Sequence, residues 1–131
     1  MLQTVSAVAA VVLIGMGNAS ATPADDACAT LLEVRGHLLA MIDNTDHAVR
    51  DDLKRRVYAA SAQLESTVGE MADSDAAKAR AFKPIWEEFK KTREKEIIPA
   101  VYAGRKAYAK TIAGGIQAVR MGKMKVALGC M

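Results

Sequence analysis

The chain has 131 residues, of which 51% are hydrophobic and 25% are charged. This length suits one domain rather than two. The formal net charge of +3 is too small to indicate binding to nucleic acid, and we expect no nucleic-acid partner.

The N-terminal segment has features of an export signal. An apolar stretch rich in alanine and valine covers residues 5–16, which is shorter than the ~20 residues needed to span a bilayer. Ala19 and Ala21 supply the small residues of an A-x-A cleavage site, although no Lys or Arg precedes the stretch. We expect a signal peptide at residues 1–21 and a soluble periplasmic domain at residues 22–131. The alternative is that the segment is retained as an anchor.

Helical periodicity begins directly after this segment, with apolar residues every three or four positions. The first expected buried stripe comprises Ala27, Leu31, Val34, Leu38 and Met41, widened by Leu32, Leu39 and Ile42. A polar turn is expected at residues 43–46. The second stripe comprises Val49, Leu53, Val57, Ala60, Leu64, Val68 and Met71. Ser74 or Asp75 can cap the helix that follows.

A third helix carries two prolines. Its apolar positions are Phe82, Ile85, Trp86, Phe89, Ile97, Ile98 and Val101. Pro84 fits the first turn of a helix that restarts there, because that turn does not use its N–H. Pro99 lies inside the pattern, so we expect a kink between Lys95 and Pro99. Gly104 is expected to end the helix.

The fourth helix is expected at residues 106–128. Its apolar positions are Ala109, Ile112, Ile116, Val119 and Val126. Gly114 and Gly115 each weaken a helix by about 1 kcal/mol relative to alanine, or they permit a close helix approach. Short connections favour antiparallel neighbours. The predicted fold is therefore all-α, an antiparallel up-down-up-down four-helix bundle.

Two cysteines lie near the ends of the expected domain, Cys28 and Cys130. In a bundle of four antiparallel helices the start of the first and the end of the fourth lie at the same end. We therefore predict a Cys28–Cys130 disulfide, as an exported protein allows. The alternatives are two free thiols or an intermolecular bridge. The sequence contains no C-x-x-C zinc motif and no C-x-x-C-H haem-attachment motif, and we expect no cofactor.

The end of the chain is basic. From residue 105 onward there are six basic residues and no acidic one: Arg105, Lys106, Lys110, Arg120, Lys123 and Lys125. This distribution favours a small anionic ligand or an anionic partner. The alternative is a solvated surface, or pairing with acidic residues such as Glu33, Glu65 and Glu70.

Two residues are candidate ligand contacts. Arg35 lies beside the apolar stripe of the first helix, where it could bind a carboxylate through two hydrogen bonds. It could equally be a surface arginine whose stem covers apolar neighbours. Trp86 is the largest apolar side chain and is either a ligand platform or part of the core.

Metal binding is an alternative. His37 and Met41 are four residues apart, His47 follows, and further sulfur is available in the last helix from Met121 and Met124. Imidazole and thioether groups can bind copper, and a non-covalent haem needs two such ligands facing each other across the core. The competing interpretation places Met41 in the core and His37 on its flank.

Catalysis has little support in the sequence. No Glu-x-x-His pair of the di-iron type is present. The acidic residues fall mostly in charged clusters, and no serine–histidine pair has an obvious orienting partner. We therefore expect a protein that is not an enzyme.

Residues 82–115 read FKPIWEEFKKTREKEIIPAVYAGRKAYAKTIAGG. This segment resembles the ligand-binding four-helix bundle of methyl-accepting chemotaxis receptors. The matching features are an aromatic pair, a charged stretch leading to two isoleucines, a small-Gly turn and an Ala-rich last helix. They correspond to Trp86 and Phe89, Arg93, Ile97 and Ile98, and Ala103 and Gly104.

The resemblance implies a periplasmic sensor fold that tends to form homodimers. No ligand-binding motif matches residue by residue, and the family's turn commonly reads Gly-Asp where this chain has Gly104-Arg105. Receptors of that family carry membrane spans and a cytoplasmic signalling region, for which residues 22–131 offer no candidate. The preferred interpretation is a non-enzymatic ligand-binding or sensory bundle acting with a membrane-bound signalling partner. The alternative is a haem- or copper-binding bundle in electron transfer or metal handling.

Overall fold

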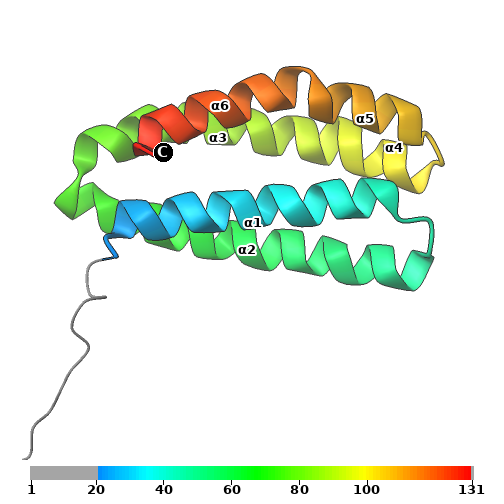
Figure 1. The fold of residues 1–131 in the computed structure, drawn as a ribbon, viewed down its shortest axis with the longest axis horizontal. Helices are drawn as coiled ribbons and strands as arrows, with labels where there is room; N and C mark the ends of the chain where they lie inside the picture. Colours follow the sequence, from blue (N-terminus) through cyan, green and yellow to red (C-terminus); the bar gives the residue numbers. More distant parts are fainter. Residues whose placement is uncertain (1–20, 131) are drawn as a thin grey trace, which may run out of the picture.

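The computed structural model describes residues 21–130, so the predicted signal peptide lies outside the described part apart from Ala21. These residues form helices and no strand, which confirms the all-α prediction (Figure 1). The elements are α1 (Pro23–Asp43), α2 (His47–Ser74), α3 (Ala76–Thr92), the π-helix η1 (Arg93–Ile97), α4 (Ile98–Tyr102), α5 (Lys106–Gly114) and α6 (Ile116–Leu128). Within residues 21–130, no helix is long and apolar enough to cross a membrane.

These elements form four rods, because α3, η1 and α4 are continuous and only Gly115 separates α5 from α6. Figure 1 shows the rods lying alongside one another. Asp43, at the end of α1, pairs with Lys110 of α5, with 3.1 Å between Oδ1 and Nζ. Cys28, near the start of α1, is bonded to Cys130 beyond α6. The first and fourth rods are therefore antiparallel.

The second and third rods are antiparallel by the same argument. The indole N–H of Trp86 donates to Glu65 of α2, and the hydroxyl of Tyr58, earlier in α2, donates to Glu94 of η1. The later residue of one rod thus contacts the earlier residue of the other. The third and fourth rods are linked through Gln117, whose side-chain amide donates to the carbonyl of Phe89 over 2.9 Å.

Side chains cap the first two helices. The Thr22 hydroxyl accepts from the N–H of Asp25, and the Asp25 carboxylate accepts from the N–H of Thr22, which forms a capping box at the start of α1. Asp46 accepts from the N–H of Val49 over 3.0 Å at the start of α2. Asp75 occupies the expected N-cap position of α3 but makes no capping hydrogen bond; its carboxylate pairs with Lys78 over 3.2 Å.

The two prolines of the third rod behave differently. The expectation that the helix restarts at Pro84 is wrong, because α3 begins at Ala76 and runs through it. Pro84 is exposed, so water can satisfy the carbonyl that loses its partner. The kink expected before Pro99 takes the form of η1, in which the N–H of Ile98 bonds the carbonyl of Arg93.

Glycines mark the end of the third rod and a break within the fourth rod. Gly104 has φ 77°, and the N–H of Arg105 bonds the carbonyl of Ala100, so Gly104 ends the third rod as expected. Gly115 interrupts the fourth rod. A Cβ there would lie 2.8 Å from the carbonyl oxygen of Thr111, so only glycine fits this break. No neighbouring helix approaches closely at Gly114 or Gly115.

The predicted buried stripe fails on α6. The residues that α6 buries are Gln117, Met121, Met124 and Leu128. The apolar residues expected inside are exposed: Ile116 by 50%, Val119 by 53% and Val126 by 80%. Leu32, Leu39 and Val49 were also expected to be buried and are exposed. One helix can bury only one face, and on α6 the packed face is the one that carries the methionines.

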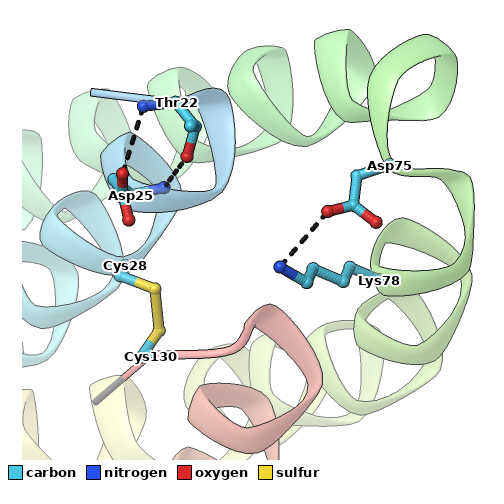
Figure 2. Close-up of a disulfide and its surroundings, with 6 residues drawn as sticks. All are labelled: Thr22, Asp25, Cys28, Asp75, Lys78 and Cys130. Atoms are coloured by element: carbon cyan, nitrogen blue, oxygen red, sulfur yellow. Dashed lines mark hydrogen bonds and ion pairs between the residues drawn. A yellow bond between two sulfur atoms is a disulfide. The ribbon is translucent and has the colours of Figure 1, made fainter. Parts of the chain in front are cut away.

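The disulfide prediction agrees with the structure. The sulfurs of Cys28 and Cys130 are 2.00 Å apart and their α-carbons 5.7 Å apart, within the usual range for a bridge. Figure 2 shows the bridge one turn below the Thr22–Asp25 capping box. Gly129, with φ 75°, turns the chain out of α6 and directs Cys130 toward α1.

Candidate ligand-binding site

Arg35 lines a groove between α1 and α5 of about 240 Å³. Leu39 and Ile42 continue its wall along α1, and Lys110 and Gly114 form the α5 side. The guanidinium of Arg35 is half-buried and makes no hydrogen bond or ion pair with any residue in the described part of the chain. Its donors are therefore available to a ligand.

The charge of the groove is positive. Asp43, at one end, pairs with Lys110 over 3.1 Å and with Lys106 over 3.9 Å. One carboxylate thus faces two ammonium groups, and Arg35 adds a third cation without a counter-charge. The groove therefore favours an anion.

The groove lies where the fourth rod breaks. α5 ends at Gly114, which is exposed and has nothing within 4 Å of a Cβ built on it. The absence of a side chain there keeps the space beside Leu39 open. The sequence identified Arg35, Lys110 and the glycine pair separately, but only the folded chain places them around one groove.

Trp86, the other candidate contact, is a core residue 2% exposed. Its ring stacks between Phe82 and Phe89, with centroid distances of 5.8 and 5.7 Å. One edge reaches a separate hollow of about 320 Å³ between α2 and α3, which Glu65 also lines. Arg35 and Trp86 do not share a site.

The carboxylate of Glu65 is engaged within the protein. It accepts from Trp86 Nε1 over 2.8 Å and from the ammonium of Lys90. Burial alone would raise the pKa of Glu65, but the hydrogen bonds from Lys90 and Trp86 outweigh it and lower that pKa. The Glu65 carboxylate is therefore not free to attract a ligand to the hollow beside Trp86, although Lys83, which also lines this hollow, makes no ion pair within residues 21–130.

A buried arginine in η1 was not identified as a site residue from the sequence. The Nε of Arg93 donates to Glu94 and its Nη1 donates to Ser61, each over 2.8 Å. Its guanidinium also lies 5.4 Å from the centroid of the Tyr58 ring. The spacing Phe82, Trp86, Phe89, Arg93 and Ile97 places this arginine in the apolar stripe, which was the available signal.

This Arg93 cluster is internally satisfied. Glu94 accepts from both Arg93 and Tyr58, and Ser61 donates onward to the carbonyl of Val57 over 2.7 Å. Burial, followed by the hydrogen bond to Glu94, raises the pKa of Tyr58 to about 12. The cluster joins η1 to α2 and leaves no free group for a ligand.

The predicted metal candidates differ in their exposure. Met41 is fully buried, whereas His37 lies on the flank of α1, with its Nε2 3.7 Å from Glu33. His47 is exposed at the start of α2. Residues 21–130 contain no cluster of three or more His, Cys, Asp or Glu side chains with metal-binding geometry.

Comparisons with protein-family models, with curated proteins and with solved structures found no match to this chain. The relation to chemotaxis-receptor sensor domains therefore remains a resemblance read from the sequence.

Proposed function

We propose that this protein is a non-enzymatic periplasmic bundle that binds a small anionic ligand and presents its bound state to a membrane-bound partner. The observation that carries the proposal is the unpaired guanidinium of Arg35 in a groove that Lys110 and Asp43 also line. Arginine matches a carboxylate with two parallel hydrogen bonds.

The size and walls of the groove narrow the ligand class. About 240 Å³ is below the ~300–1,000 Å³ of pockets for drug-sized ligands. The side chains of Leu39, Ile42 and Ala113 are apolar, so one part of the ligand can be hydrophobic. A short monocarboxylate with an aliphatic or aromatic tail fits both properties.

A thermal-shift titration tests this assignment with butyrate and benzoate as probes. Butyramide and benzamide serve as controls of nearly the same shape without the charge. The carboxylates should raise the melting temperature in a concentration-dependent way, because they bind the folded state. An equal rise with the amides, or no rise with any carboxylate at millimolar concentration, would contradict the proposal.

Two arginine variants locate the effect. Arg35→Gln removes the proposed contact and should abolish the carboxylate-dependent shift. Arg55→Gln is the matched control, because Arg55 lies on α2 with a side chain 71% exposed, and its ion pair within residues 21–130 is with Asp52. It should leave the shift unchanged. A shift that survives Arg35→Gln places the ligand elsewhere.

Export is supported by two local features. The A-x-A site ends at Ala21, and the next residue, Thr22, is the N-cap of α1, so cleavage there would leave the capping box intact. The Cys28–Cys130 pair suits an oxidising compartment. Intact mass of the protein recovered from the periplasm should correspond to a chain beginning at Thr22. A mass that retains residues 1–21 would indicate an anchor or a different compartment.

A further inference from the structure

The outward face of α6 is apolar where a surface helix is normally polar. Its exposed residues are Ile116, Val119, Gly122, Lys123 and Val126. At about 100° per residue they occupy an arc of ~120° around the helix. Three of the five are large aliphatic residues, and Val126 is 80% exposed. A shallow apolar hollow of about 580 Å³ lies over four of these residues, Val119, Gly122, Lys123 and Val126, and is also lined by Ala118 and by Ile85 of α3.

The charged residues of α6 itself are all positive, and Glu88 of α3 lies beside Arg120 and Lys123. Lys123 lies within it and Lys125 beside it, and neither makes an ion pair with a residue in the described range 21–130. Arg120 on the other border is 3.8 Å from Glu88 and is therefore partly neutralised. No acidic residue occurs from residue 105 to the end of the sequence. The α6 face thus combines aliphatic side chains with two uncompensated lysines.

We propose that the α6 face docks onto an anionic lipid surface. Aliphatic side chains bordered by lysines are what an interfacial helix presents to a membrane, with the apolar atoms at the headgroup boundary and the ammonium groups near lipid phosphates. Lysine stems can also lie along the apolar layer while their charges remain in water. In Figure 1 α6 runs along an outer edge of the bundle, where a flat surface can reach it.

A second copy of the chain is a poorer occupant. Two α6 faces brought together would place the like charges of Lys123 and Lys125 of both copies in one interface, which is unfavourable. The face also offers only a few residues, whereas a standard protein interface uses ~20–30 on each side. Membrane association does not need that many, because lipid packs around small groups of side chains and the anionic headgroups supply the counter-charge.

Vesicle co-sedimentation tests the proposal with phosphatidylcholine vesicles that contain or lack 30% phosphatidylglycerol. The intact mass of the purified protein is measured first, so that a retained apolar stretch at residues 5–16 is not mistaken for the α6 face. Binding should require phosphatidylglycerol and should weaken when the salt concentration is raised, because the interaction is partly electrostatic. Absence of binding to anionic vesicles at low salt would overturn the proposal.

Paired variants assign the binding to α6. Val119→Ser with Val126→Ser should lower the partition coefficient roughly tenfold or more, by removing apolar contact. The control pair, Leu32→Ser with Val49→Ser, removes exposed aliphatic residues from α1 and α2 and should bind like the parent. Circular dichroism confirms that each variant is folded. Equal loss in both pairs would refute the assignment to α6.

Charge variants provide a second, independent readout. Lys123→Gln with Lys125→Gln should also lower the partition coefficient roughly tenfold. Lys91→Gln with Lys95→Gln removes the same charge from the third rod and should have a much smaller effect. Sedimentation velocity of the parent decides the remaining alternative. A dimer that the Val119→Ser, Val126→Ser pair dissociates would assign the face to a second copy and overturn the lipid proposal.

Discussion

The neighbouring helices α3 and α6 differ in how well sequence periodicity predicts their buried face. On α3 the predicted aromatic positions are inside, with Phe82, Trp86 and Phe89 no more than 2% exposed. On α6 the predicted positions are outside, and Val119 and Val126 are among the most exposed large apolar residues. The two helices pack against each other, so the difference does not come from their place in the bundle.

The comparison shows that apolar periodicity predicts the buried face of a helix only when one face carries clearly more apolar surface than the other. Burying the aromatic face of α3 gains more free energy than burying any other face of that helix would. On α6 both faces carry apolar residues, and the methionines of the inner face compete with the valines of the outer one. The break at Gly115 and the bridge through Cys130 constrain the two ends of α6.

The largest expected effect comes from removing the centre of the α3 face. Trp86→Ala should lower the free energy of unfolding by about 3–5 kcal/mol, because it leaves a cavity between two stacked rings. Val126→Ala on α6 should change it by less than about 0.5 kcal/mol. Urea denaturation followed by circular dichroism measures both. A large loss for Val126→Ala would mean that α6 packs through its apolar outer face after all.

The next largest effect is expected from the disulfide that constrains the end of α6. Replacing Cys28 and Cys130 together by serine should cost about 2–5 kcal/mol, because the bridge closes a loop over 102 residues of sequence. The denaturation midpoint of the double variant should match that of the parent protein under reducing conditions. Two alkylatable thiols in the native oxidised protein would show that the bridge is absent.

A smaller effect distinguishes the two glycines at the break. Gly115→Ala should destabilise the protein by roughly 1–3 kcal/mol, because the added Cβ overlaps the carbonyl of Thr111. Gly114→Ala is the matched control. It meets nothing within 4 Å and should stabilise by up to about 1 kcal/mol through helix propensity. If both variants were stabilising, the fourth rod would tolerate a continuous helix.

The smallest effect is the pH dependence of the Arg93 cluster. Tyr58 has a pKa of about 12 in the folded protein, above the ~10 of a free tyrosine. The folded state therefore holds this proton more tightly than the unfolded state, so stability should fall as the pH rises from about 10 through 12. Tyr58→Phe should make this loss shallower in denaturation curves recorded at several pH values. An identical loss in Tyr58→Phe would assign it to other groups.

The Glu94→Gln variant separates the two causes of the raised Tyr58 pKa. It removes the charge of the acceptor but leaves the burial of the ring. The pKa of Tyr58 should fall towards the ordinary value without reaching it, because burial is the larger cause. The absorbance of ionised tyrosine at alkaline pH, compared with Tyr58→Phe, gives the measurement.

The sequence alone determined the helical class, the turn regions and the partners of the bridge. Apolar spacing of three to four residues over long segments has no other regular solution, and polar turns such as residues 43–46 separate the segments. The parity of the helices then predicted Cys28 beside Cys130. The kink before Pro99 was predictable for an equally local reason, since a missing N–H must be accommodated within one turn.

Only the tertiary structure decided which face of α6 is buried and which charges lack a partner. The inner face of α6 depends on the break at Gly115 and on the hydrogen bond from Gln117 to Phe89, and this hydrogen bond joins residues of different rods. Asp43, the carboxylate that lines the same groove as Arg35, pairs with two lysines of the fourth rod, and no ion pair of Arg35 occurs within residues 21–130. Periodicity records how residues are spaced along one helix, but burial and pairing depend on what the neighbouring helices place opposite them.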